Sequence, residues 1–212
     1  MPLLKVFLFN PLQVNAYLIY EPNGAGILID PSCIDQSEFK ELQDFIGINH
    51  IRLEYQLNTH GHFDHVFGVH RVSEAYHPKY LIHQADEVFL RLAGEQARSI
   101  GFDYEGDVPA PDGYLNEPDV VSTDTIRLKV IYVPGHTQGC VAFYEESAGW
   151  LFSGDTLFAG GIGRTDLPGG NYEQIITSIQ KKLLILPDDT KVFPGHGTAS
   201  TIKHERLTNP FL

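Results

Sequence analysis

The side chains best suited to chemistry are gathered in one short segment, residues 59–65. Three imidazoles and one carboxylate occur there within six residues, at His60, His62, Asp64 and His65. In an extended segment His60 and His62 point to the same side, because side chains alternate along a strand. Imidazole nitrogens and carboxylate oxygens are common ligands of zinc, iron and manganese. The segment therefore predicts a metal site and not merely a polar turn.

Three later segments each place a ligand-type residue beside a glycine, directly after an apolar run. They contribute His136, Asp155 and His196. One such turn alone predicts little, because Gly-His and Gly-Asp turns are common. Together with the first segment they supply five histidines and two aspartates. That number matches two metal ions that share one bridging carboxylate, placed on loops at strand ends.

This pattern resembles the metallo-β-lactamase superfamily, whose motif His-x-His-x-Asp-His, followed by distant His, Asp and His, occurs here in order. The resemblance covers nearly the whole chain, from residues 15–19 and 27–31 to residues 209–212. It implies two divalent metal ions, with zinc as the first choice and iron or manganese as alternatives. It also implies that Asp64 and Asp155 are the catalytic carboxylates. The implied ligands form two sets with one bridge: His60, His62 and His136; Asp64, His65 and His196; and Asp155 between them.

A pair of ions implies a particular reaction. Two cations roughly 3.5–4 Å apart lower the pKa of a shared water from about 15.7 to about 7. The resulting hydroxide attacks an acyl carbon, and a thioester suits this attack because the departing thiolate needs little protonation. Within the superfamily, the glycine-rich segment 160–170 is similar to that of glyoxalase II and its short bacterial relatives. The resemblance therefore implies hydrolysis of S-lactoylglutathione or a related acyl-glutathione.

One departure from glyoxalase II concerns the binding of glutathione. The full-length enzymes carry a C-terminal helical segment that supplies cationic contacts, whereas the tail here has only Lys203, His204 and Arg206 as basic residues. Arg164, in the glycine-rich segment, is therefore the candidate substrate-binding residue. Its rigid guanidinium can hold a substrate carboxylate, or it can pair with Asp166 and shape the loop. The sequence leaves both readings open.

The sequence also bears on four other function classes. A persulfide dioxygenase of the same superfamily, with one iron, would use His60, His136 and Asp155, a two-histidine, one-carboxylate set suited to oxygen chemistry. A true β-lactamase is disfavoured, because those enzymes are generally exported and use no bridging aspartate at the position of Asp155. Nucleases of the superfamily generally carry an added domain, for which this chain has no room. The intact ligand set argues against a non-enzymatic binding module.

Composition limits the possible partners and the location. The 212 residues, 42% of them hydrophobic, favour one domain spanning residues 1–212 with a sizeable core. A net charge of −12 repels phosphate backbones and anionic lipid, so we expect a small-molecule substrate and no nucleic-acid or membrane partner. Cys33 and Cys140 stand in no paired motif, and the first apolar run is too short for a signal peptide, which favours the cytoplasm. Cys140 fits strand packing better than a reactive thiol, and the oligomeric state stays open.

The elements that must position these residues fall into two groups. The predicted strands are residues 5–9, 15–20, 26–30, 55–59 and 80–83, and then 126–133, 141–144, 150–152 and 191–193. Helices are predicted after an Asp35 N-cap, over residues 66–76 and 85–99, and after an Asn171 N-cap as far as Leu183. This order predicts an α/β fold of two sheets with helices outside, and the resemblance specifies an αββα sandwich.

Two further expectations concern residues outside the motif. The acidic, proline-containing segment 101–119 is predicted to be a long solvated loop. Half of the histidines lie in no glycine turn after a strand, and we expect them on the surface or in helix packing: His50, His70, His77, His83 and His204.

Overall fold

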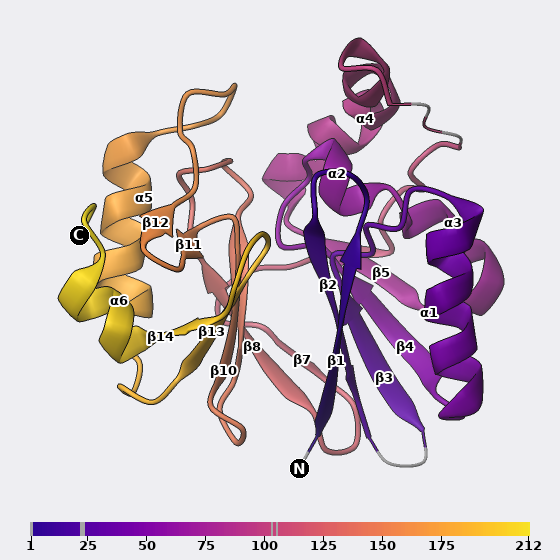
Figure 1. The fold of residues 1–212 in the computed structure, drawn as a ribbon, viewed down its shortest axis with the longest axis horizontal. Helices are drawn as coiled ribbons and strands as arrows, with labels where there is room; N and C mark the ends of the chain where they lie inside the picture. Colours follow the sequence, from indigo (N-terminus) through magenta and orange to yellow (C-terminus); the bar gives the residue numbers. More distant parts are fainter. Residues whose placement is uncertain (1, 22–23, 103, 105) are drawn as a thin grey trace.

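Two sheets pack face to face, and helices cover their outer faces, in a computed structural model that describes residues 2–21, 24–102, 104 and 106–212 (Figure 1). This arrangement confirms the predicted αββα sandwich. The first sheet has six strands in sequence order, with β1 and β2 antiparallel and β3, β4, β5 and β6 running parallel to one another. Its strands are β1 (Leu3–Phe9), β2 (Val14–Tyr20), β3 (Ala25–Ile29), β4 (Arg52–Leu57), β5 (Lys79–Ile82) and β6 (Gly113–Tyr114).

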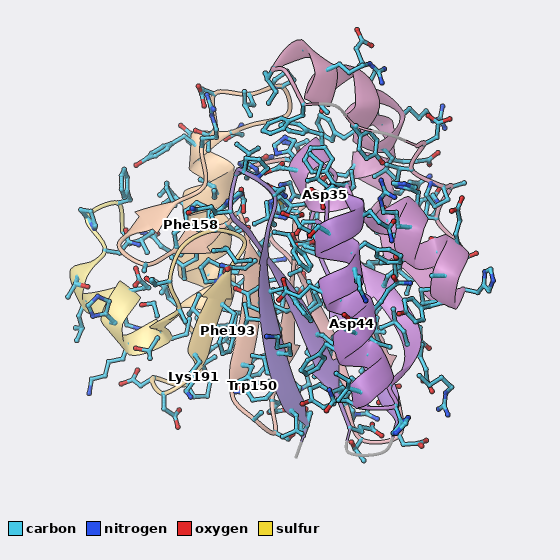
Figure 2. All side chains as sticks on the ribbon, turned by 45° about the vertical axis from the view of Figure 1, so that its right-hand side comes forward. Asp35, Asp44, Trp150, Phe158, Lys191 and Phe193 are labelled. Carbon is cyan, nitrogen blue, oxygen red and sulfur yellow. The ribbon has the colours of Figure 1, made fainter. Side chains whose placement is uncertain are left out.

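The second sheet has the order β14-β13-β10-β9-β8-β7. Its strands are β7 (Val120–Ser122), β8 (Arg127–Tyr132), β9 (Val141–Glu145), β10 (Trp150–Gly154), β13 (Lys191–Pro194) and β14 (Ser200–Thr201). Strands β10 and β13 are parallel, and the labelled Trp150, Lys191 and Phe193 show how closely they run (Figure 2). Because β8 and β10 are each antiparallel to β9, the ends of β8, β10 and β13 meet at one edge of the sheet. The small hairpin β11 (Leu157–Phe158) and β12 (Gly161–Ile162) follows β10.

The helices lie where their apolar faces can be buried. They are α1 (Gln36–Ile48), α2 (Phe63–Val66), α3 (Val69–Tyr76), α4 (Glu87–Ser99), α5 (Tyr172–Ser178) and α6 (Ile202–Thr208). Asp35 caps α1 as predicted, and its carboxylate accepts hydrogen bonds from the backbone N–H groups of Ser37 and Glu38 (Figure 2). Helix α1 then buries Phe39 and Leu42 against the first sheet.

Apolar side chains fill the space between the sheets and the space under the helices. Ile27 and Leu57 of the first sheet meet Phe143 and Phe152 of the second in the central cluster, and all four are fully buried. Separate clusters lie under α1 and under α5. Burial on both faces is what the near-continuous apolar runs of β3 and β9 require.

Two predicted helices are interrupted. The helix expected over residues 66–76 is divided into α2 and α3 at Gly68, whose backbone passes close to Pro31 and Cys33. A Cβ atom at Gly68 would lie 2.4 Å from the Cys33 sulfur, so the close approach requires glycine. The last long helix begins at its predicted Asn171 cap but continues beyond α5 as a π-helical segment, Ile179–Leu183.

The prediction for residues 101–119 is partly wrong. The segment is irregular apart from β6, but it is not wholly solvated, because Tyr104 and Leu115 are buried. Leu115 joins the central cluster, and Tyr104 packs on Phe67. The acidic residues Asp103 and Glu105 lie outside the described residues. Within the described ranges, no helix has the length and apolar character needed to cross a membrane.

Candidate metal centre

Seven polar side chains converge at one end of the sandwich, between the ends of the two sheets. We call them the metal cluster: His60, His62, Asp64, His65, His136, Asp155 and His196. All but His196 are buried, which is unusual for groups of this kind unless they are paired or bind a metal. The structure thus brings together every residue that the sequence assigned to the metals.

Strand ends explain this convergence. His60 and His62 follow β4, and Asp64 and His65 lie in the one-turn helix α2 directly after them. On the other sheet, the loops after β8, β10 and β13 carry the cluster's remaining three residues. Since those three strands point the same way, their loops emerge at the same edge.

The interatomic distances divide the cluster into sets of three. One set is His60, His62 and His136, and another is Asp64, His65 and His196; within each set the ligand atoms lie within 4.8 Å of one another. His62 Nδ1 lies 2.9 Å from His136 Nε2, and His65 Nε2 lies 3.3 Å from His196 Nε2. Asp155 lies with His60 and His65 in a third such set.

Hydrogen bonds outside the cluster orient its imidazole rings. His65 Nδ1 lies 3.0 Å from Asp30 Oδ2, His136 Nδ1 lies 2.7 Å from the Arg164 carbonyl, and His196 Nδ1 lies 3.0 Å from the Leu12 carbonyl. Each acceptor fixes a proton on Nδ1 and turns Nε2 toward the cluster. Rings held in this way are typical of metal ligands.

His60 provides the clearest test of whether a metal fits. The Thr59 hydroxyl donates to Asp30, so it accepts from His60 Nδ1, which lies 3.1 Å away. His60 Nε2 is then left fully buried without a hydrogen-bond partner, and so is Asp155 Oδ1. Buried acceptors without donors are costly, and a cation among them satisfies both. The donor set of imidazole and carboxylate fits one or two divalent metals.

The electrostatics of the cluster follow from burial and mutual proximity. Burial and the neighbouring imidazoles lower the pKa of His60 far below its usual value, and they lower that of His62 to about 3. Burial opposes ionisation of Asp64, but His65 and His196 outweigh it and lower its pKa to about 2. His65 faces three carboxylates, which outweigh its burial and raise its pKa to about 10. His60 and His62 are therefore neutral and Asp64 is ionised, which are the forms that bind metals, whereas His65 holds a proton that a bound metal would displace.

Two buried aspartates beside the cluster were missed by the sequence analysis. Asp30 holds both His65 and Thr59, and it follows the buried strand β3 just as the ligands follow their strands, so this position was the available signal. Asp86 is fully buried and accepts hydrogen bonds from the backbone N–H groups of Gly61 and Gly139 and from the Thr137 hydroxyl. Asp86 precedes α4 and does not directly follow a buried strand, so its position in the sequence gave no such signal.

Arg164 lies at the rim of the cavity above the cluster. Its guanidinium pairs with Asp166 through two contacts of 2.8 Å, and its side chain is 60% exposed. This pairing is one of the two alternatives that the sequence left open. Arg164 also lines the cavity, so substrate binding by this residue stays a prediction.

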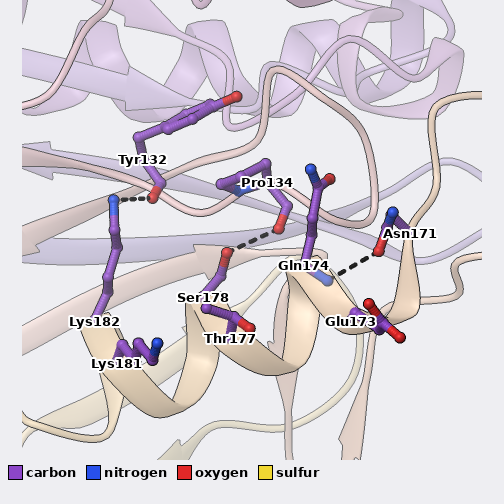
Figure 3. A pocket seen from close by; sticks show the side chains of 9 residues that line it. All are labelled: Tyr132, Pro134, Asn171, Glu173, Gln174, Thr177, Ser178, Lys181 and Lys182. Atoms are coloured by element: carbon purple, nitrogen blue, oxygen red, sulfur yellow. Dashed lines mark hydrogen bonds between the residues drawn. The ribbon is translucent and has the colours of Figure 1, made fainter.

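The cavity above the cluster has a volume of about 540 Å³. Besides the cluster it is lined by Leu12, by Phe63, by α4 with Ile100 at its end, and by the loop 164–168. A second hollow, of about 560 Å³, lies along α5 (Figure 3). No cluster residue lines that hollow; there the Ser178 hydroxyl donates to the Pro134 carbonyl and so anchors the loop that carries His136.

The remaining titratable residues singled out from the sequence lie away from the cluster. His83 stacks on Tyr132, His70 packs near Tyr104, and the other three histidines are exposed: His50, His77 and His204. Cys33 and Cys140 are buried free thiols. Burial raises the pKa of Cys140, and it raises that of Cys33 to about 12, so both thiols are protonated at neutral pH.

Comparison with known proteins gives consistent matches over nearly the whole chain. A family model described as the metallo-beta-lactamase superfamily matches residues 9–196. The hydroxyacylglutathione hydrolase GloC of Haemophilus influenzae is 34% identical, covering 99% of this chain and 97% of that protein. TTHA1623, crystallised in a di-iron-bound form, is 36% identical with a TM-score of 0.87, covering 98% of this chain and 100% of that one. BLEG-1, described as a B3 metallo-beta-lactamase, is 31% identical with a TM-score of 0.90 and 99% coverage of both chains.

Proposed function

Because the chain belongs to the metallo-beta-lactamase superfamily, as its motif predicts, we propose that it is a metal-dependent hydrolase of a thioester. The proposed substrate is S-lactoylglutathione or a related acyl-glutathione. The name of the similar GloC, a hydroxyacylglutathione hydrolase, supports this choice. The superfamily consists mostly of hydrolases that bind one or two divalent metals, which fits the donor set of the cluster.

The position of Asp155 carries the proposal. One of its oxygens lies 3.5 Å from His65 Nε2, and the other lies 3.7 Å from His136 Nε2. A carboxylate between two ligand sets is suited to bridging two ions. We propose zinc at both positions, with iron or manganese as alternatives; the di-iron form of TTHA1623 supports iron as an alternative.

Two bound ions would supply an activated water and stabilise negative charge on a carbonyl oxygen. The chain's own residues set the conditions for this chemistry. Asp30 and Thr59 hold His65 and His60 in fixed orientations, so the ligand atoms need no rearrangement. Asp64 and Asp155 are the proposed catalytic carboxylates, since both line the cavity and would hold the ions that activate the water.

The charge of the chain supports a small-molecule substrate. With a net charge of −12, the surface repels nucleic acid and anionic membranes, so neither is a proposed partner. We also propose a cytoplasmic location, which the two buried free cysteines support because unpaired thiols persist in reducing compartments.

The test is hydrolysis of S-lactoylglutathione by the purified protein, before and after removal of metal with a chelator. We expect hydrolysis that chelation abolishes and added zinc restores. A β-lactam is the comparison substrate, because the similar BLEG-1 is described as a B3 metallo-beta-lactamase. Cleavage of the β-lactam without cleavage of any thioester would overturn the proposal.

A further inference from the structure

Apolar side chains line much of the cavity above the metal cluster. Phe63 of α2, Phe89 of α4 and Ile100 at the end of α4 form what we call the apolar wall. Phe89 packs edge-on against the His62 ring, with centroids 5.3 Å apart, so the wall begins directly beside the cluster. Ile100, at the end of α4, is 56% exposed at the outer end of the cavity. Apolar surface therefore runs from the cluster to the cavity mouth.

Polar groups beside the apolar wall are few. Gln96 and Ser99 are the polar lining residues contributed by α4. The Ser99 hydroxyl is already engaged with the Gln96 carbonyl at 2.7 Å. Among the described residues that line the cavity, Arg164 is the one positively charged side chain outside the cluster, and it lies on the loop 164–168, which also lines the cavity with Leu167 and Pro168. A substituent lying along α4 therefore meets the apolar side chains of Phe89 and Ile100 beside the Gln96 amide.

The geometry of a thioester links the apolar wall and this loop. Its carbonyl carbon carries two substituents, the acyl chain and the sulfur of the carrier thiol. When the carbonyl is at the cluster, the two substituents point away from each other. If one follows the apolar wall, the other is free to pass the loop that carries Arg164 and Asp166. The anionic groups of a glutathione carrier fit the Arg164 side, because a guanidinium is the group there that can hold a carboxylate.

We propose that the apolar wall is an acyl-binding subsite and that the preferred substrates are thioesters of straight-chain acyl groups longer than lactoyl. This inference rests on the proposed thioester hydrolysis and specifies its substrate class. Each methylene buried against carbon contributes about 0.8 kcal/mol, equivalent to roughly two- to four-fold in kcat/KM per added carbon when burial is partial. A lactoyl group is short and carries a hydroxyl, so it uses little of the wall.

Two isoleucines provide a matched pair of variants. Ile100→Asn places an amide on the apolar wall, and asparagine is well tolerated at the end of a helix. Ile48→Asn makes the same change at the end of α1, where Ile48 is 78% exposed and lies outside the residues that line the cavity. Since both side chains are largely exposed, neither change should unfold the protein.

The experiment measures kcat/KM for glutathione thioesters from acetyl to octanoyl, on the wild type and both variants. We expect kcat/KM to rise with chain length in the wild type and in Ile48→Asn, and the rise to flatten in Ile100→Asn. A wild-type series without any rise would overturn the subsite, and so would an Ile100→Asn series as steep as the wild type.

Binding of non-hydrolysable thioethers separates this inference from the proposed function. Calorimetry compares S-hexylglutathione with S-methylglutathione, and we expect the hexyl compound to bind roughly ten-fold or more tightly to the wild type. That preference should shrink in Ile100→Asn. If the hexyl preference is present but no thioester is cleaved, the hydrolase proposal fails while the subsite stands. If thioesters are cleaved without any chain-length preference, the subsite fails while the hydrolase stands.

Discussion

Asp86 and Thr137 lie 51 residues apart in the sequence, yet the Thr137 hydroxyl donates a 2.7 Å hydrogen bond to the Asp86 carboxylate. The same carboxylate accepts from the backbone N–H of Gly61, at 2.8 Å. Asp86 thereby joins the segment that carries His60 and His62 to the loop that carries His136. Both connected glycines are sterically required, because a Cβ atom at Gly61 or at Gly139 would collide with Asp86. One buried side chain thus fixes the spacing between the two parts of the first ligand set.

Asp86→Asn should weaken metal binding without changing any ligand. The amide has one acceptor oxygen in place of two, so at least one of the three donors loses its partner, at a cost of about 1–3 kcal/mol. We expect metal to be lost at lower chelator concentrations and the urea midpoint to fall. Asp44→Asn is the matched control, because Asp44 is 57% exposed and pairs only with Lys40. Equal metal affinity in Asp86→Asn and the wild type would show that Asp86 does not position the ligands.

His196→Ala distinguishes the hydrolase from the persulfide dioxygenase. The change removes one ligand of the second set and leaves His60, His136 and Asp155, the three that a single iron would need. A two-metal hydrolase should lose roughly 100-fold or more in rate, whereas a one-iron dioxygenase should keep much of its oxygen consumption with glutathione persulfide. Both activities are measured on one preparation, with the exposed His204→Ala as control. Retention of full thioesterase activity would exclude a role for the second ligand set.

Arg164→Ala should raise KM for a glutathione thioester several-fold, with a smaller loss of kcat, as expected when uniform binding is removed. The His136 contact should survive, because it uses the Arg164 backbone carbonyl. The KM and kcat for a neutral thioester should barely change. Arg52→Ala, which breaks a similar exposed pair with Glu54 outside the cavity, is the control. Equal losses of kcat/KM for the two substrates would mean that the pair with Asp166 only shapes the loop.

The two cysteines should be unreactive in the folded protein. Burial raises the pKa of the Cys33 thiol to about 12 and also raises that of Cys140. Because only the unfolded chain ionises these thiols near their usual pKa, the free energy of unfolding should fall as the pH rises from about 9 to 12. A thiol reagent at pH 8 should label both residues only after denaturation. Rapid labelling of the native protein with loss of hydrolysis would instead indicate a cysteine nucleophile.

Four of the ligands were predictable because their signal is local: His60, His62, Asp64 and His65 occupy one strand-to-helix turn. His136, Asp155 and His196 were assigned through their glycine turns and the resemblance to the family motif. Asp30 and Asp86 were not predictable in this way, since their partners lie 25 to 53 residues away and are brought to them only by the packing of β3 and α4.

Contacts between distant segments also limit how much of the fold the sequence predicts. The apolar patterns of β3, β9 and β10 placed these strands correctly, because burial between two sheets requires them. The break at Gly68 depends on a contact with Cys33, which lies on another element. Leu115 is buried although its acidic neighbourhood predicts exposure, because it packs into the core between the sheets.

We propose that Asp155 joins two metal ions that hydrolyse a thioester. The test is the metal-to-chain ratio of anaerobically purified wild type and Asp155→Ala, measured with S-lactoylglutathione hydrolysis on the same samples. We predict about two ions per wild-type chain. In Asp155→Ala we predict lower metal content and no hydrolysis, because the like charges of the two ions are no longer offset by a shared carboxylate. A variant that keeps both ions tightly bound and retains most of its activity would contradict the account.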